Sequence, residues 1–242
     1  MPRFFTDYPL ADGQSLPLPD SVVRHIRVLR LHEQDEIVLF NGKGNAFRAV
    51  LTSVGKRTAE ARIVGEMPSA DKESHLHITL IQAVSSGERM DFTIQKSVEL
   101  GVNTIIPVSA ERSVVRLSGE RADKRIQRWQ EIAVSACEQC GRNIVPAIAP
   151  LQTLQQAFAG LPADTDLKLL MSLNHAQKLG AFTKPKSAVL MIGPEGGWTE
   201  AEEAAAFAAG FQSVLLGGRV LRTETASLAA IAAMQTLWGD FV

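Results

Sequence analysis

Most can be learned about this chain from two glycine-bearing loops, Gly193-Pro194-Glu195-Gly196-Gly197 and Leu216-Gly217-Gly218-Arg219-Val220-Leu221-Arg222-Thr223-Glu224-Thr225-Ala226. Each loop follows a short apolar run, at 188–192 and 214–216, and each leads into an alanine-rich stretch with helical character. Open α/β sheets build ligand crevices at strand ends from such successions of strand, glycine-rich turn and helix. Because glycine lets a ligand approach the backbone closely, the two loops predict a small molecule held largely by main chain.

Strand and helix patterns alternate in the sequence around these loops. The helix after the first loop is predicted to begin with the capping box Thr199-x-x-Glu202. Further strands are predicted at 75–84, 104–108, 167–173 and 188–192, and helices at 90–100 and about 120–141. Because strands alternate with helices, we predict an α/β fold with a mostly parallel sheet.

Residues 1–70 form a separate pattern that predicts a small β-rich domain. The apolar run Glu36–Phe40, the turn Asn41–Gly44 and the run Ala46–Leu51 have the signature of a hairpin. An apolar stripe at Val22, Ile26 and Leu29 predicts a short helix before it. The polar, proline-containing stretch 67–74 is the best domain boundary, so we expect domains at 1–70 and 75–242.

The composition limits the classes of function. The chain has 242 residues, 45% of them hydrophobic, and a net charge of −1, so any nucleic-acid surface must come from local clustering of basic residues. Neither a run long enough to span a membrane nor a secretory signal is evident, which favours the cytoplasm and no membrane partner. The two cysteines, Cys137 and Cys140, lie on one helical face and are interpreted as core thiols rather than as a redox pair or metal site.

The residues of the two loops narrow the type of ligand. The first loop lacks the Lys-Ser/Thr of a phosphate loop and the spacing of a dinucleotide turn, and Glu195 would repel a phosphate. In the second loop, Thr223 or Thr225 could simply cap a helix, with Glu224 favouring its dipole. That interpretation leaves Arg222 unexplained, because a cation is unfavourable at a helix N-terminus. We therefore expect Arg222 to contact an anionic or polar partner.

Together the two loops resemble those of the bacterial 16S ribosomal RNA uridine-N3 methyltransferases, the ribosomal RNA small subunit methyltransferase E family of the SPOUT superfamily. The resemblance covers essentially the whole chain in order. It extends to the segments Arg24–Arg30, Gly87–Phe92, Gln95–Val102 and Ala136–Arg142.

This resemblance implies a fold, a cofactor and a partner. The fold would be an N-terminal PUA-like β-barrel followed by a SPOUT domain with a trefoil knot. The cofactor would be S-adenosylmethionine (SAM), the protein a homodimer, and the target a decoding-centre uridine of 16S rRNA in the small ribosomal subunit. The cofactor would be held by Leu170, Met171, Ser172, Ile192, Gly193, Glu195, Gly197, Leu216, Gly217, Val220, Leu221, Thr223 and Thr225. For Leu216, Val220 and Leu221, a place in the core is the alternative.

The same resemblance suggests roles for charged residues. Arg222 would stabilise the deprotonated base, and Glu224 would orient the base or take its proton. Phosphate contacts supply most RNA affinity, and the candidates for them are Arg24, Arg27, Arg89, Lys96, Arg112 and Arg142. The basic stretch Arg121–Arg128 is interleaved with acids and is interpreted as a solvated helix face.

Two other functions remain open at the level of sequence. A non-catalytic RNA-binding or ribosome-assembly factor could retain the same fold, but it would have no need of the cofactor loop. A nucleotide-dependent enzyme is disfavoured because the phosphate-loop lysine is missing. Binding of SAM would separate the first of these from a methyltransferase.

Overall fold

The computed structural model describes residues 1–68, 73–174 and 176–241, which divide into two compact units. The first contains residues 1–68 and Glu73, together with Cys137–Val145. The second contains Ser74–Ala136 and the chain from Pro146 onward.

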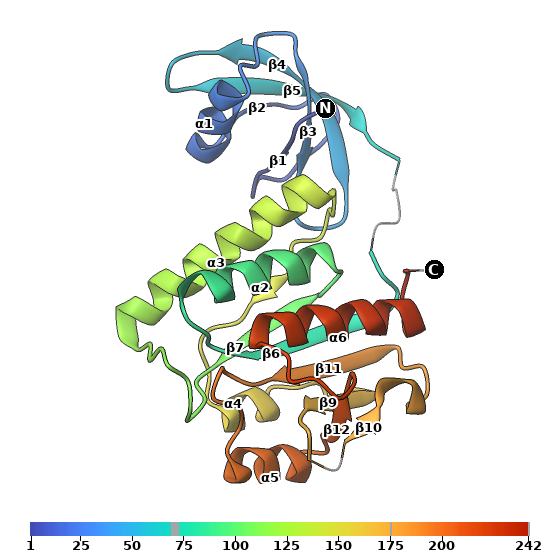
Figure 1. Cartoon of the computed structure of the whole chain (residues 1–242). Helices are drawn as coiled ribbons and strands as arrows, with labels where there is room; N and C mark the ends of the chain where they lie inside the picture. The colour runs from blue at the N-terminus through green and yellow to red at the C-terminus, as the bar shows by residue number, and fades with distance from the viewer. Residues whose placement is uncertain (69–72, 175, 242) are drawn as a thin grey trace. The chain divides into compact units, whose positions relative to one another are not determined.

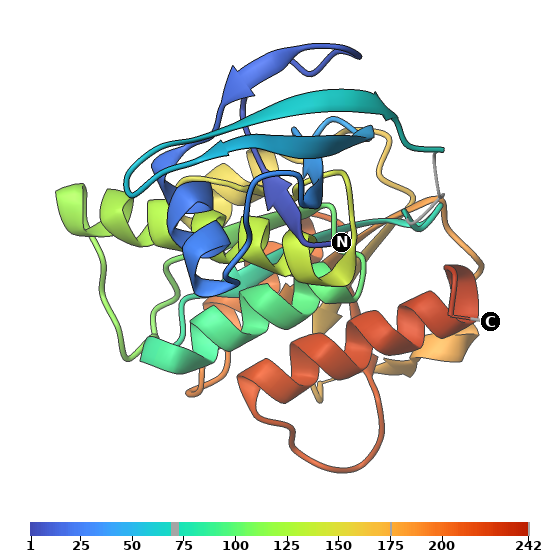
Figure 2. The same ribbon diagram turned by 90° about the horizontal axis from the view of Figure 1, so that it is seen from above.

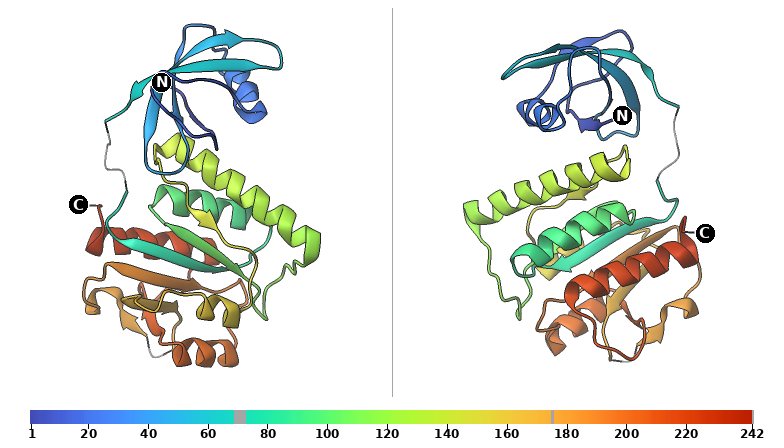
Figure 3. Two further views of the ribbon diagram at one scale, coloured as in Figure 1. Left: turned by 180° about the vertical axis from the view of Figure 1, so that it is seen from behind. Right: turned by 45° about the horizontal axis from the view of Figure 1, so that its top comes forward.

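The first unit is a five-stranded sheet with one helix, drawn in blue and cyan in Figure 1. The order of the strands is β1-β3-β4-β5-β2, with β1 and β3 parallel and the other neighbours antiparallel. Both views of Figure 3 show the helix beside the sheet, where Val22, Val23 and Ile26 enter the core. The elements are β1 (Arg3–Phe5), β2 (Ser15–Pro17), α1 (Asp20–Val28), β3 (Glu36–Phe40), β4 (Ala46–Val54) and β5 (Ala59–Glu66).

The second unit is a seven-stranded sheet of order β10-β12-β9-β11-β6-β7-β8, in which all described neighbours run parallel. Its strands are β6 (His77–Ala83), β7 (Thr104–Val108), β8 (Ala147–Ile148), β9 (Leu167–Met171), β10 (Gln177–Lys178), β11 (Ser187–Ile192) and β12 (Gln212–Leu215). Its helices are α2 (Gly87–Glu99), α3 (Gly119–Cys140), α4 (Leu154–Ala159), α5 (Glu200–Ala208) and α6 (Thr223–Trp238), with a 3₁₀ turn at Leu179–Ala181. The last four residues of α3 belong to the first unit.

Helices cover both faces of the parallel sheet, which explains why its central strands are apolar without alternation. Residues 188–192 of β11 are all almost completely buried. In Figure 1, α2 and α6 lie on one face of the sheet and α4 and α5 on the other. Figure 2 shows α2 and α6 side by side. On the opposite face, Trp198, Ala206 and Phe211 pack with Val189 and Met191.

The predicted elements agree closely with the observed ones. The hairpin forms from β3 and β4, and the capping box at Thr199 is present, since its hydroxyl accepts a hydrogen bond from the Glu202 N–H. Cys137 is a buried thiol and Cys140 a half-buried one, both unbridged, and burial raises the pKa of Cys137 to about 12. No helix in the described part of the chain is long and apolar enough to cross a membrane.

Candidate functional site

A cavity of about 910 Å³ opens where three neighbouring strands, β12, β9 and β11, reach their carboxyl ends. This is where parallel α/β sheets place ligands. The two glycine-bearing loops supply most of its lining. The cavity is lined by residues 171–174, 192–198, 214–217 and 219–223, with Arg89, Glu203, Ala226 and Ala229.

Most of the predicted cofactor residues come together in this cavity. Leu170 is fully buried inside β9, and neither it nor the exposed Thr225 is among the lining residues. The residues that do line it are Met171, Ser172, Ile192, Gly193, Glu195, Gly197, Leu216, Gly217, Val220, Leu221 and Thr223.

The first loop is a tight turn that Arg112 holds through hydrogen bonds. The Gly197 N–H donates to the Pro194 carbonyl at 2.9 Å, and Gly197 has a φ of +70°, which favours glycine. The Arg112 guanidinium donates to the carbonyls of Gly196 at 3.3 Å and Trp198 at 3.2 Å. A Cβ on Gly196 would lie 2.9 Å from the Arg112 Cβ, so the loop and Arg112 are closely fitted.

Glu195 ties this loop to the start of α2. Its carboxylate accepts hydrogen bonds from the Ser86 N–H, the Ser86 hydroxyl and the Arg89 guanidinium, each at 3.1 Å. Burial alone would raise the pKa of Glu195, but these hydrogen bonds outweigh it and the pKa lies below its ordinary value. Glu195 is therefore a carboxylate at neutral pH, and its charge is paired with that of Arg89 in this wall of the cavity.

The second loop leads into α6 without a side-chain cap. The N-cap residue is Arg222, and no side chain caps the helix there, so the capping interpretation of Thr223 and Thr225 is wrong. The reason is that the Thr223 hydroxyl donates instead to the Gly193 carbonyl at 2.7 Å, which joins the two loops. Val220 is 84% exposed, which leaves an apolar side chain beside the cavity.

Arg222 and Glu224, the predicted catalytic pair, flank Thr223 at this helix start. The Arg222 side chain is exposed and makes no hydrogen bond or ion pair within the described residues. Glu224 Oε1 lies 4.0 Å from Arg89 Nε, whereas its buried Oε2 has no partner in the described part of the chain. Arg222 is among the residues that line the cavity and Glu224 is not, and neither side chain has a strong partner within the described residues.

Sequence reasoning missed residues that reach the cavity from other elements. Glu203 on α5 accepts hydrogen bonds from the Ser172 hydroxyl at 2.7 Å and the Asn174 amide at 2.9 Å. The Trp198 Nε1 is buried without a partner among the described residues. The capping box that fixes the start of α5 could have suggested that Glu203 lies near the strand ends, but no sequence signal singles out Trp198.

The predicted RNA-contact residues have different surroundings. Arg24 and Arg27 are exposed on α1, whereas Arg89 and Arg112 hold the first loop and Lys96 pairs with Glu99 at 2.7 Å. Arg142 is only 3% exposed and its guanidinium binds Glu73 at 2.6 Å, so burial leaves it no surface for RNA. We therefore leave Arg142 out of the RNA-contact set.

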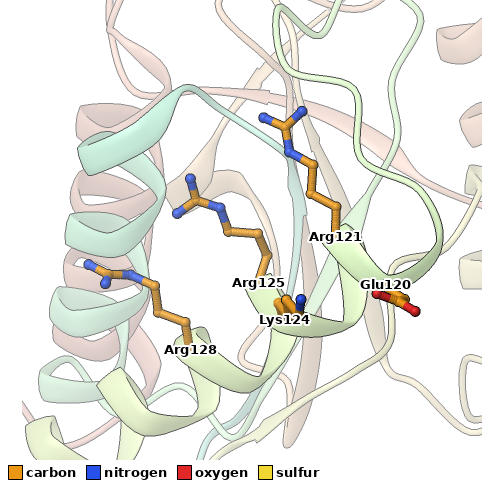
Figure 4. Close-up of a pocket in the computed structure, with 5 residues that line it drawn as sticks. All are labelled: Glu120, Arg121, Lys124, Arg125 and Arg128. Atoms are coloured by element: carbon orange, nitrogen blue, oxygen red, sulfur yellow. The ribbon is translucent and has the colours of Figure 1, made fainter.

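A second, more open hollow of about 540 Å³ follows the basic stretch of α3. Figure 4 shows the guanidinium groups of Arg121, Arg125 and Arg128 extending to the same side of the helix. Arg128 is held by Asp91 on α2 at 2.7 Å. All five residues that line this hollow carry charged side chains, and none of them comes from the two glycine-bearing loops.

Known protein families match residues in both units. A family model described as an RNA methyltransferase domain matches residues 72–235, and a model described as an RNA methyltransferase PUA domain matches residues 18–64. Ribosomal RNA small subunit methyltransferase E of Buchnera aphidicola is 35% identical over 244 residues, covering 100% of this chain and 95% of that protein.

Solved structures agree with this relationship. A ribosomal RNA small subunit methyltransferase E from Neisseria gonorrhoeae, bound to S-adenosyl methionine, is 58% identical with a TM-score of 0.96 and covers 100% of both chains. A Legionella pneumophila protein solved with bound SAM is 36% identical with a TM-score of 0.93, covering 99% of this chain and 98% of that one. The chain therefore belongs to the ribosomal RNA small subunit methyltransferase E family.

Proposed function

We propose that this protein is a SAM-dependent methyltransferase of small-subunit ribosomal RNA, and that it methylates N3 of a decoding-centre uridine in 16S rRNA. The observation that carries the proposal is the cavity in which both glycine loops meet and which Arg222 helps to line. The proposal is also supported by the similarity of the whole chain to proteins that are named as methyltransferases.

The residues of the cavity fit SAM, and its loops lack the lysine of a phosphate loop. Its volume of about 910 Å³ is in the range of small-molecule sites. The carboxylates of Glu195 and Glu203 in its lining suit the sulfonium and ammonium charges of SAM. The exposed Val220 offers an apolar face, and Trp198 Nε1, which has no partner among the described residues, offers a hydrogen-bond donor.

Bound SAM would supply an electrophilic methyl group, and the chain must prepare the uracil nitrogen to receive it. The N3 imide proton has a pKa of about 8.5–10, so removing it at neutral pH costs about 2–4 kcal/mol. The Arg222 guanidinium, donating to a uracil carbonyl, would stabilise the negative charge that develops. Glu224 would accept the N3 proton. Methyl transfer would form the bond to N3 as the methyl–sulfur bond breaks, with S-adenosylhomocysteine as the leaving group.

We assign the two parts of the chain different tasks in this reaction. Residues 1–70 would form a PUA-like domain that contacts rRNA phosphates through the exposed Arg24 and Arg27. Residues 75–242 would be the SPOUT domain, whose chain passes through a trefoil knot around the cofactor. The protein would act as a homodimer in the cytoplasm, where its ribosomal substrate is found.

Gly196→Ala is expected to weaken SAM binding about tenfold or more, because the new Cβ would lie 2.9 Å from the Arg112 Cβ and 3.2 Å from the Arg112 carbonyl oxygen. Neither atom is the end of a flexible side chain, so the first loop must move. Isothermal titration with SAM measures the effect. Gly218→Ala is the matched control, since a Cβ there meets nothing within 4 Å. Equal affinities of the two variants would contradict the assignment of this loop to the cofactor.

Two measurements test the proposed function itself. Titration of the purified protein with SAM should give saturable binding, whereas a non-catalytic assembly factor would give none. Small subunits from cells that lack the gene should then gain one methyl group when incubated with the protein and SAM. Mass spectrometry of rRNA fragments should place this group on N3 of a uridine, and a methyl group on ribose or on another base would overturn the N3 assignment.

A further inference from the structure

A chain of buried hydrogen bonds runs beneath the cavity, and it begins at Gln82 on β6. The Gln82 side chain is fully buried. Its carboxamide nitrogen donates to the Thr223 hydroxyl oxygen at 3.0 Å and to the Ala83 carbonyl at 3.1 Å. Its carboxamide oxygen accepts from the Ser227 hydroxyl at 2.6 Å. Both polar ends of this buried amide are therefore satisfied.

The donor groups fix the direction of the hydrogen bonds that lead from Gln82 through Thr223 to Gly193. The amide nitrogen of Gln82 can only donate, so the Thr223 oxygen must accept from it. The single proton of the Thr223 hydroxyl is then available to the Gly193 carbonyl, at 2.7 Å. Gln82 thus holds Thr223, and Thr223 holds the first residue of the glycine loop.

These hydrogen bonds join three segments that must be held in fixed positions for the reaction: the end of β6, the first glycine loop and the start of α6. Gln82 lies beside Ile192 in the β6–β11 pairing, and sheet hydrogen bonding ends there, one residue before Gly193. On the other side, Thr223 separates Arg222 from Glu224, at a helix start that has no side-chain cap. The hydrogen bonds from Gln82 therefore tie the start of α6 to β6 at the point where the β6–β11 pairing has ended.

We propose that Gln82 is a positioning residue of the active site, an inference that rests on the proposed SAM-binding function. Through Thr223 it sets the Gly193 carbonyl in the cofactor cavity and the start of α6 at a fixed separation. It touches neither cofactor nor substrate, since it is fully buried and does not line the cavity.

Gln82→Met tests this role because methionine nearly preserves the volume and removes every side-chain hydrogen bond. The SAM dissociation constant is expected to rise about tenfold, and turnover at saturating SAM is expected to fall by at least a similar factor. Isothermal titration with SAM and with S-adenosylhomocysteine, thermal unfolding, and turnover on small subunits are the measurements.

Gln235→Met is the matched control. Gln235 is an equally buried glutamine on α6, bonded to the Leu100 carbonyl at 2.9 Å and the Ser74 hydroxyl at 2.7 Å, and it does not line the cavity. Gln235→Met should lower the melting temperature, as Gln82→Met does, but should leave the SAM dissociation constant within about twofold of the wild-type value.

The possible outcomes separate this role from a general loss of stability. Unchanged SAM affinity and turnover in Gln82→Met would overturn the positioning role, and so would equal losses in the two variants. If Gln82→Met does not fold, Thr223→Val and Thr223→Ser test the next link, and only valine should weaken SAM binding by about tenfold. Wild-type protein that binds no SAM would instead overturn the proposed function, and the positioning role with it.

Discussion

Arg222→Ala is expected to lower turnover on small ribosomal subunits by about 10²- to 10³-fold, the usual cost of removing one preorganised donor to a developing anion. The affinity for SAM should change little. The exposed guanidinium of Arg222 makes no hydrogen bond or ion pair within the described residues, so its removal costs the loop no contact. Single-turnover assays at saturating SAM, with binding measured separately by titration, distinguish the chemical step from cofactor capture.

The position of Arg222 supports this role. It is the N-cap residue of α6, where the helix dipole disfavours a positive charge, and no side-chain hydrogen bond within the described residues compensates. An anionic uracil would relieve that unfavourable charge. Because neutral-pH ionisation of the imide costs about 2–4 kcal/mol, one well-placed guanidinium can supply much of the stabilisation required.

The pH dependence provides an internal control for Arg222→Ala. Without the guanidinium, the rate should rise about tenfold per pH unit up to the ordinary imide pKa, since more of the base is then already ionised. The wild-type rate should rise less steeply over the same range. Arg222→Lys keeps the charge and should recover part of the activity. Near-normal turnover of Arg222→Ala at neutral pH would show that the electrostatic role is wrong.

The sequence predicts the sheet and the cavity well because both depend on local patterns. Continuous apolar runs give buried parallel strands, and glycines after such runs give loops at the strand ends. The runs at 188–192 and 214–216, each with its glycine loop, therefore indicate where along the chain the cavity forms. The prediction that Leu170 holds the cofactor is not matched by the cavity lining, because a strand residue and a strand-end residue look alike in sequence.

The rest of the site depends on contacts between distant segments, which no local pattern encodes. Thr223 was expected to cap α6 or to hold the cofactor, yet its hydroxyl spans 30 positions in sequence to reach Gly193. Gln82 is one of three polar residues in β6, with His77 and Thr79, and its two partners on α6 lie 141 and 145 positions away. Arg142 was expected to face RNA, but its ion pair with Glu73 buries it. Tertiary contacts decide what such polar residues do.

Glu224→Ala is expected to reduce turnover by about 10²- to 10⁴-fold, the range for loss of a positioned general base. Glu224 Oε2 is buried without a partner in the described part of the chain, and its carboxyl group lies 4.0 Å from the guanidinium of Arg89. An unpartnered buried acceptor costs free energy in the resting protein, and a donor from the substrate would satisfy it. The N3–H of uracil is such a donor.

Glu224→Gln separates proton transfer from orientation. The glutamine carbonyl can still accept a hydrogen bond from N3–H and orient the base, but it cannot take the proton. If Glu224 is the proton acceptor, the glutamine variant should be about as slow as alanine at neutral pH, with SAM binding and melting temperature close to wild type. Near-wild-type turnover of Glu224→Gln would show that the carboxylate only orients the base. Water would then accept the N3 proton, and Arg222 would stabilise the uracil anion without help from a general base.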